Sequence, residues 1–163
     1  MDTTISRDTL RELHGWTHGC LDLIDRHASG MAADLYTRTV PGFGRGSIRD
    51  QMVHICRAEA IWVCALQNQP RPDIRPEDFA TADSVASLRT HVVAETLRYL
   101  DQLPESRLNR ELDQYPGYWA GPHRSPAFIL THVLTHAFHH KGQIVAMFRI
   151  LGHPAPDTDL QRV

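Results

Sequence analysis

Four of the 11 histidines lie in one 25-residue apolar segment, residues 127–151, and this segment constrains the fold most. Pro126 precedes the segment and Gly152 follows it, which is typical of a helix with a defined start and end. On a helix, residues four apart lie on the same face, so His132, His136 and His140 form a ladder. The apolar residues that share this face are Ile129, Val133, Met147 and Leu151. The ladder is therefore expected to face the interior.

Two interpretations of the ladder compete. The histidines are either neutral core residues satisfied by hydrogen bonds, or ligands of a metal ion. Each ring has two nitrogens, and a buried polar group without a partner costs about 1–3 kcal/mol. Spacing of i, i+4 lets two imidazoles of one helix reach one ion, which satisfies a nitrogen on each ring. We therefore favour metal binding.

The pair His136 and His140 is the preferred ligand pair, because Gly142 and Gln143 follow it closely and glycine allows another backbone to approach. Spacing alone does not separate this pair from His132 and His136. His132 is thus a ligand, a hydrogen-bonding partner of a ligand or a proton carrier. His139 points about 100° away from His140 and is expected at the surface or an interface.

Other histidines offer further ligands. His54 shares an inward face of a predicted helix with Ala58, Ile61 and Ala65, and is the natural third ligand. His14 and His18 are also four apart, but no third ligand is obvious near them in the sequence. We therefore favour core roles for His14 and His18.

Apolar periodicity and capping residues predict four long helices, at residues 8–27, 48–67, 84–103 and 127–151. A short helical turn is expected at residues 32–36, and a short strand or extended segment at residues 108–112. The connections are unequal, and those after the first two helices are long enough for a crossover. The expected fold is an all-α four-helix bundle in a single domain, residues 1–163.

Composition excludes several classes of protein. The formal net charge is −2 and no basic or aromatic patch is evident, so nucleic acid is not an expected partner. No apolar run is long enough to span a membrane, and the polar start is unlike a signal peptide. The three cysteines form no C-x-x-C pair and look like small core residues of a cytoplasmic protein.

Three neutral imidazoles suit zinc, nickel, copper or iron(II), and three protein ligands leave a position open, as in catalytic sites. A water or thiol bound there would be acidified. No H-E-x-x-H, E-x-x-H or G-x-S-x-G motif is present, which argues against a zinc protease, a di-iron bundle or a serine hydrolase.

Residues 132–160, HVLTHAFHHKGQIVAMFRILGHPAPDTDL, resemble the last helix and tail of the DinB/YfiT-like metalloproteins. In that family H-x-x-x-H is followed by R-G-Q, a hydrophobic run, Leu-Gly and a terminal Thr-Asp-Leu. Residues 46–66, GSIRDQMVHICRAEAIWVCAL, are similar to the family's second helix, and residues 13–23, LHGWTHGCLDL, to its first. The resemblance covers most of the chain.

The resemblance implies an up-down-down-up four-helix bundle, usually dimeric. It also implies a divalent metal, zinc or nickel, on three histidines, which by position are His54, His136 and His140. Lys141 stands where the family usually has arginine. The family includes thiol transferases and isomerases that use glutathione, mycothiol or bacillithiol.

The leading functional hypothesis is a metal-dependent S-transferase or isomerase, in which a low-molecular-weight thiol attacks a small-molecule electrophile. His132, Tyr115 or Tyr118 would carry protons or position the substrate, although packing roles suit both tyrosines. One alternative is a non-catalytic metal-binding stress or sensor protein. The other is a structural bundle whose histidines are satisfied by hydrogen bonds. We also expect a homodimer.

Overall fold

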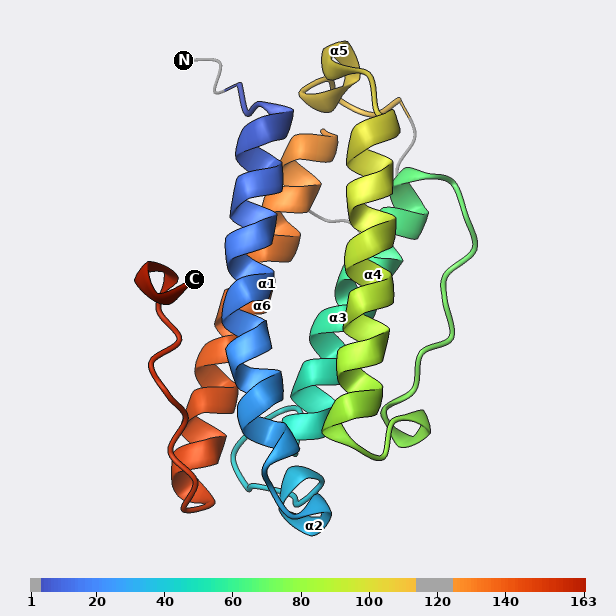
Figure 1. Cartoon of the computed structure of the whole chain (residues 1–163). Helices are drawn as coiled ribbons and strands as arrows, with labels where there is room; N and C mark the ends of the chain where they lie inside the picture. The colour runs from blue at the N-terminus through green and yellow to red at the C-terminus, as the bar shows by residue number, and fades with distance from the viewer. Residues whose placement is uncertain (1–3, 114–124) are drawn as a thin grey trace.

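The structure is a computed structural model that describes residues 4–113 and 125–163. Four long helices run along the molecule (Figure 1): α1 (Arg7–Ser29), α3 (Ile48–Leu66), α4 (Ala82–Gln102) and α6 (Pro126–Ile150). The shorter elements are α2 (Ala33–Tyr36), η1 (Pro76–Asp78), α5 (Glu105–Leu108) and η2 (Leu160–Arg162). Within the described ranges there is no strand. The predicted all-α four-helix bundle is confirmed.

The helix directions give the topology. In Figure 1, α1 and α6 run downward, whereas α3 and α4 run upward, which is the predicted up-down-down-up order. The segment between α3 and α4, residues 67–81, returns along the whole bundle so that these consecutive helices are parallel. α3 packs against α4 and α6, and α1 packs against the same two helices. Antiparallel α3 and α6 therefore share a long interface.

Polar side chains fix where the helices start. The hydroxyls of Ser6, Ser47 and Ser125 accept hydrogen bonds from backbone N–H groups in the first turns of α1, α3 and α6. α4 starts at Ala82 rather than at the predicted residue 84, because Thr81 and Ser84 form a reciprocal capping box. Ser84, predicted as the start of the helix, is the second member of this capping box.

One local prediction is wrong. Leu108 does not begin an extended segment but ends the helical turn α5, and its side chain is buried. Pro104 lies immediately before this turn, where a missing N–H costs no helical hydrogen bond. The predicted turn at residues 32–36 is present as α2.

Apolar side chains from all four long helices fill the interior. Cys20 and Cys56 are buried and Cys64 is half-buried, and all three are free thiols. On α6, Leu130 and Leu134 are covered by this chain itself. None of the helices described is long and apolar enough to cross a membrane.

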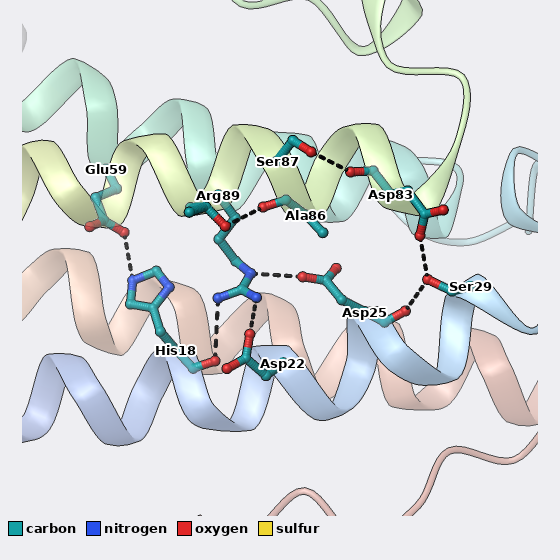
Figure 2. A network of polar contacts seen from close by, with 10 residues as sticks. His18, Asp22, Asp25, Ser29, Glu59, Asp83, Ala86, Ser87 and Arg89 are labelled. Atoms are coloured by element: carbon teal, nitrogen blue, oxygen red, sulfur yellow. Dashed lines mark hydrogen bonds and ion pairs between the residues drawn. The ribbon is translucent and has the colours of Figure 1, made fainter.

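A buried ion-pair network joins α1 to α4 (Figure 2). The Nε of Arg89 donates to Oδ2 of Asp25 at 2.8 Å, and the guanidinium also bonds Asp22 and the carbonyl of His18. Arg89 and Asp25 are 6% and 5% exposed. Burial raises the pKa of Asp25, and the neighbouring Arg89 opposes that rise. This network was not predicted from the sequence.

Two glycines of α1 provide a stability test. A Cβ at Gly15 would meet nothing within 4 Å, whereas one at Gly19 would lie 3.0 Å from the Cβ of Val163 in the C-terminal tail. Gly15→Ala should therefore raise the free energy of unfolding by about 0.5–1 kcal/mol, since alanine loses less backbone entropy. We expect a rise in Tm of about 1–4 °C by calorimetry.

Gly19→Ala is the matched control for this substitution. Its added methyl group presses on the tail, so it should stabilise less than Gly15→Ala or destabilise. Equal stabilisation by both substitutions would contradict the packing of the tail against α1.

Candidate metal centre

Three histidines from two antiparallel helices converge near the middle of the bundle. His54 comes from α3, and His136 and His140 come from successive turns of α6. The Nε2 atom of His136 lies 3.1 Å from the Nε2 atoms of both His54 and His140. The rings of His54 and His140 have centroids 4.6 Å apart and are nearly perpendicular. One nitrogen of each ring thus faces a shared point.

The i, i+4 spacing on α6 stacks two of these rings, and the α3–α6 contact brings in the third. His140 is buried, and His54 and His136 are half-buried. The sequence favoured His136 and His140 partly because Gly142 would let another backbone approach. That expectation is wrong, because a Cβ at Gly142 would meet nothing within 4 Å. No backbone of residues 4–113 or 125–163 approaches closely there. Gln143, in contrast, does take part in the site.

A buried glutamine sets the tautomer of His140. The Nδ1–H of His140 donates to Oε1 of Gln51 at 2.5 Å. The amide nitrogen of Gln51 donates in turn to Oε1 of Gln143 at 2.7 Å and to the carbonyl of Arg45 at 3.0 Å. These donations assign Oε1 of Gln51 as the acceptor. His140 therefore presents the lone pair of Nε2 to the other two rings.

Burial lowers the pKa of His54, His136 and His140 to about 4. The nearby cationic Arg45 adds to the shift at all three rings. All three imidazoles are consequently neutral at pH 7, the form in which histidine binds metals. Neutral rings in this orientation can present their Nε2 lone pairs to a cation.

The distances suit a small divalent ion. Zinc binds imidazole nitrogen at about 2.0–2.1 Å, so two ligands of a tetrahedral ion lie about 3.3 Å apart. The two Nε2 separations of 3.1 Å are close to this value. Three nitrogen ligands would leave one position of a tetrahedral ion open.

His132 and His139 lie outside this group of three histidines. The ring centroid of His132 is 6.0 Å from those of both His136 and Trp62, and burial lowers the pKa of His132. His139 is exposed and accepts a hydrogen bond from the Gln143 amide. Tyr115 and Tyr118 lie outside the described residues.

A cavity of about 310 Å³ opens beside His54 and His136. Its lining residues are Arg45, His54, Arg57, Ala58, Ile61, Trp62, Arg71, His132 and His136. His132 thus faces the same space as two members of the candidate centre. A small molecule in this cavity would lie next to the three imidazoles.

A second group of possible ligands lies between α1, α3 and α4. The Nε2–H groups of His14 and His18 donate to the two carboxylate oxygens of Glu59 at 2.8 and 3.0 Å, and Thr96 donates to the same carboxylate at 2.6 Å (Figure 2 shows the His18 contact). Burial disfavours ionisation of Glu59, but these histidine hydrogen bonds prevail and hold its pKa well below the usual range.

The geometry of this second group favours a structural role. The nitrogens that face Glu59 carry protons rather than free lone pairs, because each is a hydrogen-bond donor. A metal ion would have to replace those protons. Glu59 was not predicted as a partner of His14 and His18, although it is a lone carboxylate in the apolar run of α3.

Gln51 supplies a test of how the candidate centre is held. Gln51→Met removes the acceptor for the Nδ1–H of His140 while keeping the side-chain length, so zinc affinity should fall by about 10–100-fold. Gln51→Glu keeps the acceptor but turns its second carboxylate oxygen against the carbonyl of Arg45 and Oε1 of Gln143, so it should restore only part of that affinity. Competition with a chromophoric chelator measures both variants, and unchanged affinity in Gln51→Met would contradict the assigned role.

Comparisons with known proteins support the same fold. The sequence profile of the DinB family matches residues 10–163. The chain is similar to a conserved protein of Enterococcus faecalis, at 20% identity and a TM-score of 0.65, over 85% of this chain and 94% of that one. It is also similar to a DinB-like protein of Bacillus subtilis, at 18% identity and a TM-score of 0.63, over 91% and 98%. No curated protein matches the chain.

Proposed function

Because this chain belongs to the DinB family, we propose that it is a metal-dependent S-transferase that joins the sulfur atom of a low-molecular-weight thiol to an electrophile. His54, His136 and His140 would hold the metal ion. The observation that carries the proposal is the convergence of their three Nε2 atoms beside a cavity. Zinc or nickel held there would bind a thiol sulfur and lower its pKa, which supplies a thiolate at neutral pH.

The cavity favours catalysis over a sensor role. At about 310 Å³ it is at the lower end of the range for small-molecule sites. A metal-binding sensor has no need of such a space next to its ligands. The cavity would admit a small molecule beside the three imidazoles.

His132 is the residue we assign to proton transfer. Its ring lines the cavity, and its lowered pKa favours the neutral imidazole. In the proposed step His132 accepts the thiol proton, the sulfur forms a bond to an electrophilic carbon, and the leaving group departs with the bonding electron pair. Tyr118 remains a second candidate from the sequence alone, outside the described residues.

The test uses metal-free protein reloaded with zinc or nickel. Glutathione, mycothiol and bacillithiol are each supplied with chlorodinitrobenzene, and thioether formation and chloride release are followed. We expect turnover with at least one thiol above the uncatalysed rate, lost on chelation and in His136→Ala. Metal binding without turnover for any of the three thiols would favour the non-catalytic stress or sensor protein.

We further propose a homodimer in a reducing, cytoplasmic compartment. The free cysteines support the compartment. Exposed Trp16 on α1 and Phe128 on the neighbouring α6 support an additional interface. Light scattering of the purified protein tests the dimer, and a monomer at micromolar concentration would exclude a stable one.

A further inference from the structure

The cavity beside the candidate centre has a strongly cationic wall. Three of its lining residues are arginines: Arg45 precedes α3, Arg57 lies on α3, and Arg71 follows α3 in the crossover segment. None of the described residues that line the cavity is a carboxylate. Side chains from three separate parts of the chain thus bring positive charge to one space.

Elsewhere in the bundle, arginines are commonly neutralised by acids. The arginines in ion pairs are Arg7, Arg11, Arg38, Arg49, Arg75, Arg89, Arg98 and Arg162. Arg45, Arg57 and Arg71 have no ion pair with any residue that the structure describes. The positive charge on this wall is therefore uncompensated within the described part of the chain.

Arg57 gives an independent indication of a ligand. Its Nε atom is buried, yet it has no hydrogen-bond partner within residues 4–113 and 125–163. A buried donor without a partner is unfavourable, and a donor on a charged group especially so. An anion in the cavity would offset this cost by pairing with the Arg57 guanidinium, whose planar set of N–H groups matches carboxylate or phosphate oxygens.

The other walls of the cavity define the rest of the ligand. Ala58, Ile61 and Trp62 provide an apolar surface. His54 and His136, two members of the candidate centre, also line the cavity. A molecule with an anionic group and an apolar or aromatic body complements these walls. A neutral, purely apolar molecule would leave the three arginines without partners.

We infer that this cavity binds a small molecule through a carboxylate or phosphate group held by Arg45, Arg57 and Arg71. Its body lies along Trp62, and its reactive end lies next to His54 and His136. The anion site itself needs no metal ion, whereas the assignment of a reactive end rests on the proposed function. This carboxylate or phosphate group is part of either the thiol or the electrophile.

The experiment titrates metal-free, full-length protein with inorganic phosphate and with benzoate, using calorimetry or NMR. We expect Arg57→Gln to weaken binding of both probes by about tenfold or more, since a charge-assisted hydrogen bond is lost. Arg149→Gln is the matched control, because it removes an exposed charge at the far end of α6 and should leave binding unchanged. Circular dichroism verifies that both variants are folded.

Equal binding by wild type and Arg57→Gln overturns the inference. Arginine-dependent binding of either probe supports it even if no turnover is found, so its failure and that of the proposed function are distinguishable. Two comparisons then separate the sources of the anion. A higher KM in Arg57→Gln for glutathione but not its diethyl ester assigns the anion to the thiol. A higher KM for a chloronitrobenzoate but not for neutral chlorodinitrobenzene assigns it to the electrophile.

Discussion

Replacing Arg89 with leucine should lower the free energy of unfolding by about 3–5 kcal/mol. Arg89 is the hydrogen-bonded partner of the Asp25 carboxylate, and both side chains are almost fully buried between α1 and α4. Without Arg89, Asp25 remains as a buried charge that has lost its counter-ion. The second oxygen of Asp25 is already buried without a hydrogen-bond partner in the described structure, so nothing there can take over.

Urea denaturation measures this loss, and α4 offers a matched control. Arg98 pairs with Glu95 on the exposed face of the same helix, so Arg98→Leu should cost at most about 0.5 kcal/mol. Replacing both Asp25 and Arg89 with leucine should recover much of the stability, because neither position then holds a buried charge without a partner. A cost for Arg89→Leu no greater than that for Arg98→Leu would refute a buried ion pair.

Replacing His136 with alanine should weaken zinc binding by more than about 100-fold, the upper end of what a lost hydrogen-bonding partner of a ligand costs. His136 is central to the candidate centre, since its Nε2 lies next to those of both other histidines. The substitution removes one of three ligands and leaves two that belong to different helices. The fold should persist, because His136 is only half-buried.

Two other histidines provide controls for this substitution. His139→Ala removes an exposed imidazole three residues further along the same helix, and His91→Ala removes an exposed one on α4. Both variants should bind zinc within a few-fold of wild type in a chelator competition. If His139→Ala and His136→Ala lose affinity equally, the centre is not where the three Nε2 atoms converge.

The helices were predictable because their signals are local. Apolar periodicity and capping hydroxyls such as Ser6 and Ser47 lie within one or two turns of the structure that they specify. The i, i+4 spacing of His136 and His140 is equally local. His54 was predictable because an inward-facing histidine complements the ladder on the other helix, and because the family resemblance places a ligand at its position.

The polar contacts that were not predicted from the sequence join residues that are distant along the chain. Gln51 pairs with His140, Glu59 with His14, and Arg89 with Asp25, over separations that no periodicity reveals. Each is a polar residue in the buried part of a helix, which is the one signal that the sequence offers. The wrong strand prediction at residues 108–112 has a different cause, since its two leucines lie four residues apart, a spacing that suits a helical turn as well as an extended segment.

X-ray absorption at the metal edge, with elemental analysis of untagged protein, shows whether His54, His136 and His140 bind a metal ion. We predict one zinc or nickel ion per chain, bound by three imidazole nitrogens at about 2.0–2.1 Å for zinc. The absorption signal of the bound ion should disappear in His54→Ala and persist in His14→Ala. The absence of a stoichiometric ion, or an ion retained without His54 and lost without His14, would contradict the account.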